Sequence, residues 1–521
     1  MKKTFIFVIS IILATTISAQ YENADAVFEK IIKEYTLNED GSMDYHYFKE
    51  LNLISYLSFN RLYGETFIVY NPEYQNLEIN KSYTIMANGK KVETPDNAFN
   101  EVLPRAAAYS ANFNHLREMV VTHTALERGA TIYLDYTIQT EKGYWPALMG
   151  NELIEETSPV REMEIIVRVP SDVELHHKMF NLRTAPEIVV QGRQKVYTWK
   201  FMGIKASPKE SFRGKFHPET PRLLFSTAED MKAVTSWMTD QKAFDFNLSD
   251  EMITFVKKMK SEKKDEINTM LVIQEEVVEN MANDRVSPEW AGFRARTPVE
   301  GWKSNGGSRL EKTILLAALL RAADFNAIPA MTAPQKFFDK KQGNLLIFDQ
   351  ALVSVNTKGY GTIYLSAVSK QDQSLQYDLE GEVIVALRKN TGLLVVEPSA
   401  GKNRIVVESN FDFETIARLT GLLEVELTGK TNPFLDLHQD TSNIRSLFTG
   451  SVIPKGNEAI KIENSNPEKT ELTIEVEKSD SLQGIHGYYR LELPVMRNGF
   501  ESWRIQYLSS HRDDPFVLPY T

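Results

Sequence analysis

The sequence predicts a multidomain α+β protein in which a helix-containing central domain lies between two β domains. Three observations support this prediction. Residues 20–225 form short alternating segments separated by turn signals, a strongly apolar helix pattern begins at Ser308, and alternating segments return after residue 373. A chain of 521 residues is also long enough for about three domains of roughly 150 residues each.

Residues 1–19 are typical of a secretory signal peptide. Lys2 and Lys3 precede an apolar run from Phe5 to Ala14, and small residues lead to a cleavage site after Ala19. The chain has no cysteine, so it offers no lipoprotein attachment site, no disulfide and no thiolate for catalysis. No later stretch is apolar for long enough to span a bilayer. We therefore expect a periplasmic or secreted protein.

The net charge of the chain disfavours some classes of partner. The formal net charge is −11, and it becomes −13 when the two lysines of the leader are removed. Such an acidic balance disfavours nucleic acids and anionic membranes as partners. We expect a peptide, a glycan or another protein as partner, and no cofactor.

The first predicted domain, residues 20–225, is a β-sandwich. Asp40-Gly41 and Asn88-Gly89 each lie between two alternating segments, which is the strongest short-range signal of a β-hairpin. Further strands are predicted at residues 131–138, 164–169 and 195–201. Prolines and charges between residues 208 and 221 indicate a linker to the next domain.

The predicted central domain, residues 226–372, is built around one buried helix. Ser308 and Glu311 have the spacing of a capping box. The following residues from Ile314 to Ala323 leave almost no polar face, so we expect this helix to be buried on nearly every side. A short apolar run from Ala327 to Met331 predicts a strand directly after it.

Other helix and strand signals surround this central helix. Ser226 and Glu229 predict a second capping box, and apolar residues from Ile267 to Met281 recur on one face of an amphipathic helix. The predicted sheet begins within residues 345–365, where a turn at Thr357–Gly361 separates two segments.

The third predicted domain, residues 373–521, is a β-sandwich or part of one. Apolar and polar residues alternate from Leu423 to Leu427 and from Leu472 to Val476, and Asn498-Gly499 predicts a hairpin. The chain stops soon after Pro519, so we expect that a final strand is either absent or supplied by a partner.

The Gly-rich turn, capped helix and strand within residues 305–331 resemble the start of the catalytic core in transglutaminase-like, papain-like proteins. That family shows Gly, Asp, Cys, any residue, Asp at the helix start, where the helix amides favour the thiolate. Arg309 stands at the Cys position. The histidine strand of the family corresponds to residues 348–355, with Gln350 in place of His, and Ser366 replaces the orienting Asp. The resemblance therefore implies a transglutaminase fold that has lost its catalytic triad.

The first predicted domain is similar to a domain of unknown function that precedes such cores in secreted bacterial proteins. The residues that carry this likeness are the segment starting at Tyr35, the Asn-Gly turn within Ile85–Val92, the segment starting at Glu127, and Pro159-Val-Arg. The resemblance thus extends, in domain order, over nearly the whole mature chain.

Arg309, Gln350 and Ser366 are the candidate binding residues, because a cleft without its catalytic groups still presents polar side chains to a ligand. Trp290 and Trp302, just before the Gly-Gly turn, would border this cleft in the family fold. Each residue also has a structural interpretation. The arginine can be a salt-bridged helix residue, Gln350 and Ser366 can hydrogen-bond each other between strands, and the tryptophans can be half-buried core.

Other chemistry is poorly supported by the sequence. Ser308 lacks a base, since no histidine lies between His217 and His438, and Lys312 misses the Ser-x-x-Lys spacing of serine acylases. No histidine cluster has the spacing of a zinc site, although calcium bound by loop carboxylates stays open. The leading hypothesis is therefore a pseudoenzyme that binds or scaffolds a partner. The alternatives are a peptidase or glycosidase that uses paired carboxylates in a different cleft, and a purely structural module.

Overall fold

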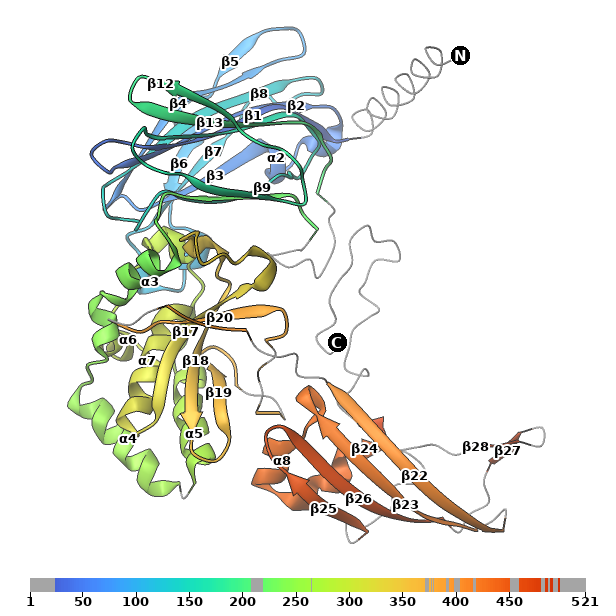
Figure 1. Ribbon diagram of the computed structural model, residues 1–521. Coiled ribbons are helices and arrows are strands. Elements are labelled where there is room, and N and C mark those ends of the chain that lie inside the picture. The colour runs from blue at the N-terminus through green and yellow to red at the C-terminus, as the bar shows by residue number, and fades with distance from the viewer. Residues whose placement is uncertain are drawn as a thin grey trace.

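The structure is a computed structural model, shown as a ribbon in Figure 1. It describes residues 24–207, 219–263, 265–370, 374–375, 377, 379–389, 393–397, 403–415, 418–449, 459–478, 483–485, 488–490 and 495–496. The predicted signal peptide, residues 208–218 of the predicted linker, and the predicted hairpin at Asn498-Gly499 lie outside the described residues.

The N-terminal part contains one large sheet of eight strands in the order β12-β13-β10-β1-β2-β8-β4-β5. The strands are β1 (Ala26–Leu37), β2 (Met43–Leu53), β4 (Gln75–Ile85), β5 (Lys91–Glu93), β8 (Thr131–Thr140), β10 (Val160–Pro170), β12 (Glu187–Gln191) and β13 (Gln194–Ile204). Neighbouring strands are antiparallel except for β1 and β10, which run parallel.

Both predicted hairpins of this sheet are confirmed. Gly41 lies in the turn between β1 and β2, and Gly89 lies in the turn between β4 and β5. Their φ angles are +86° and +83°, a left-handed conformation that favours glycine because glycine has no Cβ. The strands predicted at residues 131–138, 164–169 and 195–201 are also present, within β8, β10 and β13.

Two three-stranded sheets cover one face of the large sheet and complete a β-sandwich (Figure 1). They are β3 (Glu65–Tyr70), β7 (Arg117–Thr122) and β6 (Phe99–Val102) in one sheet, and β11 (His176–Phe180), β14 (Arg222–Ser226) and β9 (Met149–Leu153) in the other. Ile68 and Val121 of the first sheet pack with Tyr136 of β8. Leu223 and Phe225 of β14 pack into the core formed by β1, β2, β10 and β13.

Strand β14 joins this sandwich to the helical part of the molecule. Successive side chains of a strand point to opposite faces. Leu223 and Phe225 therefore face the large sheet, whereas Leu224 belongs to a second core with Phe180 and with helix α3 (Met231–Thr239). One small sheet thus has both of its faces buried, and the sandwich and the helical part pack against each other through it.

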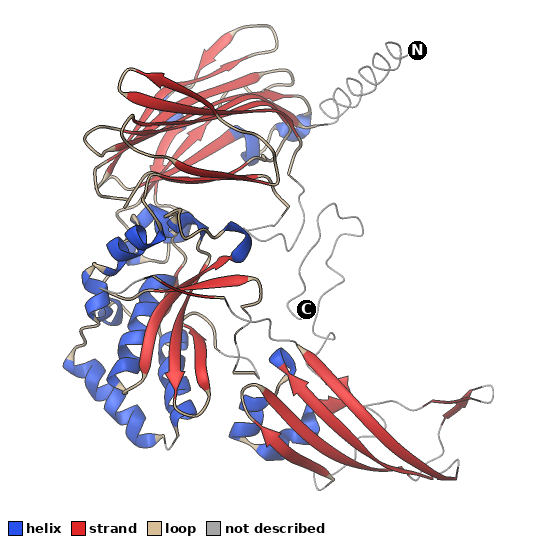
Figure 2. Ribbon diagram, viewed as in Figure 1, coloured by secondary structure: helices blue, strands red, loops and turns tan. Residues whose placement is uncertain are grey.

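A five-stranded antiparallel sheet with helices beside it forms the middle of the molecule (Figure 2). The strand order is β19-β18-β17-β20-β21. The elements are α4 (Asp250–Glu262), α5 (Glu266–Glu279), β15 (Ala282–Asp284), α6 (Pro298–Lys303), β16 (Gly306–Ser308), α7 (Arg309–Ala322), β17 (Asn326–Pro334), β18 (Gln350–Thr357), β19 (Gly361–Ser366), β20 (Glu382–Ala386) and β21 (Leu394–Val396). The strand predicted after the central helix is β17, and the predicted turn at Thr357–Gly361 joins β18 to β19.

Helix α7 is buried along most of its length, as its sequence predicted. All residues from Leu310 to Leu320 are buried, and the helix packs against α4, α5, β17 and β18. The capping box is confirmed as well. The Ser308 hydroxyl accepts the amide of Glu311 at 3.3 Å, and the Glu311 carboxylate accepts the amide of Ser308 at 2.8 Å.

The second predicted capping box, at Ser226 and Glu229, is wrong. The cap of α3 is Asp230, whose carboxylate accepts the amide of Ala233 at 2.8 Å. Ser226 instead ends β14 in a fully buried position, where its hydroxyl donates to the carbonyl of Gly343 at 2.5 Å. The hydroxyl is engaged by a contact 117 residues away along the chain, which a local sequence pattern does not reveal.

The C-terminal part contains a four-stranded antiparallel sheet in the order β22-β23-β26-β25. Its elements, with two further strand pairs and one helix, are β22 (Arg404–Thr415), β23 (Arg418–Thr428), α8 (Phe434–Gln439), β24 (Phe448–Thr449), β25 (Ile460–Ser465), β26 (Lys469–Lys478), β27 (Gln483–Ile485), β28 (Tyr488–Arg490) and β29 (Val495–Met496). The apolar residues of the two predicted alternating segments are buried in its core. Helix α8 was not predicted, and it packs Leu437 onto the same core.

The molecule is mainly β, because more of its described residues lie in strands than in helices. The assignment of the middle part as a transglutaminase-like α+β domain, and the boundaries at residues 225 and 372, stay predictions. Among the described helices, none is both long enough and apolar enough to cross a membrane.

Candidate functional site

Arg309 is the first residue of α7, and its side chain is exposed. The helix dipole opposes a cation at this end of a helix. Here the Nη1 atom donates to the backbone carbonyl of Asp349 at 2.8 Å, which holds the guanidinium beside the start of β18. The Nε and Nη2 atoms have no described partner, so these two donors can form hydrogen bonds to the two oxygens of a carboxylate.

Gln350 is the first residue of β18, directly after Asp349. Its Oε1 atom accepts a hydrogen bond from the hydroxyl of Tyr377 at 3.0 Å. Burial raises the pKa of the Tyr377 hydroxyl, whereas the charge of Arg309 and a side-chain hydrogen bond with Ser366 lower it. Tyr377 therefore bonds directly to Gln350, while Arg309 and Ser366 influence the pKa of its hydroxyl, and it was missed in the sequence.

Ser366 ends β19 and is 2% exposed. Its Oγ atom accepts the amides of Val368 and Ser369, each at 3.2 Å, and its carbonyl accepts the side-chain amide of Gln274 at 2.8 Å. These bonds shape the turn after β19. No direct hydrogen bond between Gln350 and Ser366 is described, so their shared neighbour is Tyr377.

We refer to Arg309, Asp349, Gln350, Ser366 and Tyr377 as the Arg309 corner. Its side chains include no thiol, imidazole or amine. Because burial raises the phenol pKa, Tyr377 stays protonated near neutral pH. The corner therefore offers hydrogen-bond donors and acceptors, the exposed Arg309 cation, and the half-buried carboxyl group of Asp349, whose Oδ1 atom accepts the Thr332 hydroxyl at 3.1 Å.

A buried ion pair fixes the helix start behind this corner. The Nε and Nη2 atoms of Arg296 donate to the two carboxylate oxygens of Glu311, both at 2.9 Å, and the Glu311 side chain is only 4% exposed. Gly307 allows this close approach, because an added Cβ would lie only 3.0 Å from two side-chain atoms of Glu311. Ser308 and Glu311 thus hold the first turn of α7 in place, and with it Arg309.

Lys312 is the amine nearest in sequence to the start of α7, and it lies outside the Arg309 corner. Its Nζ atom donates to the carbonyl of Met281 at 2.8 Å, and the residue is 1% exposed. Burial lowers its pKa to about 8, and the charge of Asp284 opposes this shift. The hydroxyl of Ser308 accepts a capping hydrogen bond, and no described bond links it to Lys312.

Trp290 and Trp302 lie in two different apolar clusters. Trp302 packs against Phe255 of α4 with ring centroids 5.5 Å apart, at the edge of the helix core. Trp290 packs with Phe113 of the N-terminal part, and its carbonyl accepts the hydroxyl of Tyr144 at 2.6 Å. Among the described residues, no hydrogen bond or ring contact joins either tryptophan to the Arg309 corner.

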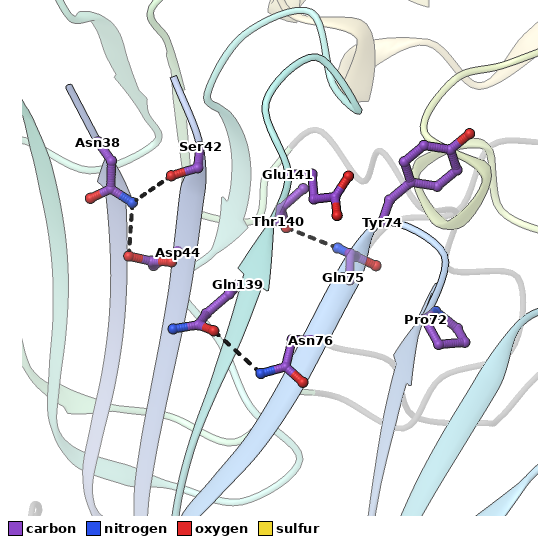
Figure 3. A pocket seen from close by; sticks show the side chains of 10 residues that line it. All are labelled: Asn38, Ser42, Asp44, Pro72, Tyr74, Gln75, Asn76, Gln139, Thr140 and Glu141. Carbon is purple, nitrogen blue, oxygen red and sulfur yellow. Dashed lines mark hydrogen bonds between the residues drawn. The ribbon is translucent and has the colours of Figure 1, made fainter. Parts of the chain in front are cut away.

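A second candidate site is a pocket of about 470 Å³ in the N-terminal sandwich (Figure 3). It lies where the β1–β2 turn, the end of β8 and the start of β4 come together. Asp44 and Glu141 both line it, so it brings two carboxylates into one pocket. In the described part of the chain, no group of three His, Asp or Glu residues could hold a metal ion.

One known family matches the N-terminal strands. Residues 39–208 match DUF3857, a domain of unknown function with a solved structure. This match confirms the predicted likeness of the first domain to a domain of unknown function. A search of curated proteins finds no match.

A solved structure also shares the fold of this chain. It is a candidate protease from Parabacteroides distasonis ATCC 8503, with a TM-score of 0.64 and 24% sequence identity over 88% of this chain and 94% of that chain. At this identity, the likeness shows the fold alone. A candidate cysteine protease from Cytophaga hutchinsonii overlaps with a TM-score of only 0.21 and 12% identity, over 48% of this chain and 88% of that chain.

Proposed function

We propose that this chain is a secreted, transglutaminase-like pseudoenzyme that binds or scaffolds a peptide, glycan or protein partner. In this proposal, residues 1–19 are a signal peptide, residues 20–225 and 373–521 form the outer β domains, and residues 226–372 form the degenerate transglutaminase-like domain. The fold shared with a candidate protease is consistent with this origin. The N-terminal match to DUF3857 agrees with the proposed first domain.

The main support for the proposal is the chemistry of the Arg309 corner. A cysteine protease needs a thiolate and a neighbouring base, but the chain has no cysteine and the corner has no histidine. Arg309, Gln350 and Ser366 stand where the resemblance places Cys, His and Asp. Each of them interacts with Tyr377, and none of these interactions pairs a nucleophile with a base.

A carboxylate is the ligand group that suits this corner best. The Nε and Nη2 atoms of Arg309 and the side-chain amide nitrogen of Gln350 are donors without a described partner. Donors from two neighbouring elements favour an acceptor, and the guanidinium favours a negative one. A peptide with an acidic side chain or a free C-terminus is therefore the first ligand to test.

Calorimetric titration with tetraglutamate, compared with tetraglutamine, tests this binding. We expect tetraglutamate to bind more tightly, and Arg309→Ala to weaken its binding about tenfold, because a hydrogen bond to a charged group contributes roughly 1.5–3 kcal/mol. Arg193→Ala is the matched control, since it removes a distant arginine whose side chain is 86% exposed. Equal affinity for the two peptides, or unchanged affinity in Arg309→Ala, would contradict the assignment of this site.

The pseudoenzyme part of the proposal requires a separate assay. The mature protein is incubated with peptide, amide and transamidation substrates, and we expect no turnover. Turnover that is lost in Arg309→Ala or Gln350→Ala would show that the corner is catalytic, and the proposal would then be wrong.

The alternative function is a hydrolase that uses carboxylates in a different cleft. The observation that favours it is the presence of Asp44 and Glu141 in one pocket. Glycoside hydrolases place two carboxyl groups on either side of the scissile bond, about 5 to 9.5 Å apart. Under this alternative, either Asp44→Asn or Glu141→Gln should abolish the release of reducing ends from an oligosaccharide.

A further inference from the structure

Part of the pocket of the N-terminal sandwich lies on the outward face of the eight-stranded sheet, and Gln75 and Thr140 line it from the register position of Met43, on the other face. Asp44, Gln139 and Asn76 stand opposite one another on β2, β8 and β4. Their neighbours Met43 and Ile138 point into the sandwich cores, so these three polar side chains point the other way. The pocket therefore contains a row of polar groups that crosses three adjacent strands.

Hydrogen bonds within the pocket fix the orientation of its amides (Figure 3). The Asn38 side chain donates to the Ser42 hydroxyl and to Asp44 Oδ2, both at 3.0 Å, and Asn76 donates to Gln139 Oε1 at 3.3 Å. The Gln139 nitrogen is then a donor without a described partner. The side-chain oxygens of Asn38 and Asn76 and the Oδ1 atom of Asp44 are acceptors that also have no described partner. The pocket thus presents both donors and acceptors to a ligand.

The charge of the pocket disfavours an anion. Asp44 and Glu141 are its two charged side chains, and no lysine or arginine is among the described residues that line it. Tyr74 also lines the pocket, but its ring stacks on Tyr144 with centroids 4.7 Å apart. We therefore expect a ligand that is held mainly by hydrogen bonds.

A neutral sugar fits this combination of groups. Each sugar hydroxyl both donates and accepts, so neighbouring hydroxyls can bond to Gln139 as acceptors and to Asp44 and Asn76 as donors. The volume of about 470 Å³ lies within the usual range for small-molecule sites, roughly 300–1,000 Å³. We propose that this pocket binds a unit of a neutral oligosaccharide, independently of the Arg309 corner.

Titration with neutral hexasaccharides of glucose, mannose and xylose tests this site in the mature protein. We expect at least one of them to bind, and expect Asn76→Ala and Gln139→Ala each to weaken that binding about fivefold or more. Asn80→Ala is the matched control, because it removes another exposed amide of β4 whose bonds go to Asp135 and Thr137, outside the pocket. The control should bind as the unchanged protein does.

The opposite outcomes are equally clear. Failure of every neutral hexasaccharide to bind at millimolar concentration overturns the proposal, and so does binding that survives both Asn76→Ala and Gln139→Ala. Tighter binding of polygalacturonate or tetralysine would show that the ligand is charged. Release of reducing ends from a bound hexasaccharide would make the pocket catalytic, and the inference of a binding site alone would be wrong. Tetraglutamate binding at the Arg309 corner does not affect any of these results.

Discussion

Arg309 shows how one residue changes the ligand that a helix start can receive. The amides at the start of a helix favour a negative group, such as the thiolate that the resemblance places there. A guanidinium at the same position has the opposite charge, and it is held by the carbonyl of Asp349. The free donors of this guanidinium then need a hydrogen-bond acceptor from a ligand. We therefore expect an acidic group of a partner, where the family would have a reactive thiolate on the protein.

Lys312 gives a prediction at the residue scale. Its pKa falls from 10.5 to about 8 in the folded protein because the amine is buried. Below pH 8 the amine is charged in both states, and the folded state bears the cost of burying it. Between about pH 8 and 10.5 the folded protein has released this proton and the unfolded chain has not, so stability rises with pH in that window.

We therefore expect Lys312→Met to be more stable than the unchanged protein by about 3–4 kcal/mol at pH 7, since one pKa unit corresponds to about 1.4 kcal/mol. The difference should shrink towards zero at pH 10.5. Urea unfolding at both pH values measures it. Lys49, whose pKa burial also lowers to about 8, titrates in both proteins and cancels in the comparison. A difference that is the same at both pH values would contradict the predicted shift.

At the scale of single elements, the start of α7 combines a cap with an ion pair, and their contributions can be separated. Ser308→Ala removes only the capping hydroxyl, so we expect a loss of about 1 kcal/mol. Glu311→Gln also breaks the buried pair with Arg296 and should cost about 3 kcal/mol or more. Thr297→Ala, which removes the half-buried cap of α6, is the control for a capping hydroxyl alone.

Urea unfolding of the three variants provides the comparison. If Glu311→Gln costs no more than Ser308→Ala, then the ion pair does not stabilise the start of α7 and the proposed support for Arg309 is absent.

The elements that the sequence predicted correctly depend on neighbours along the chain. The turns at Gly41 and Gly89 and the cap of α7 each involve residues within a few positions of one another. The errors and omissions arise from distant contacts. The hydroxyl of Ser226 bonds to Gly343, and Tyr377, which has no periodic pattern to mark it, donates to Gln350, 27 residues earlier in the chain. A local pattern therefore predicts an element well and a site poorly.

At the scale of the whole molecule, two junctions of different extent join the three parts. Leu224 of β14 belongs to a core that continues into α3, α7 and β17, so the sandwich and the helical part share buried surface. The C-terminal sheet has its own core, which includes Leu472. Helix α8 links it to the helical part through Phe434 and Leu435, with a hydrogen bond of 3.3 Å between His438 Nε2 and Asp265 Oδ1.

This difference predicts two steps in thermal unfolding of the mature protein. The sandwich and the helical part should unfold together, because opening either one exposes their shared core. The C-terminal sheet should unfold in a separate transition. Leu224→Ala, which removes about 2–5 kcal/mol of core packing, should lower the temperature of the first transition only. Leu472→Ala should lower only the second, and scanning calorimetry of both variants distinguishes the two. One transition that both substitutions shift equally would mean that α8 couples the C-terminal sheet to the rest of the molecule as strongly as β14 couples the sandwich.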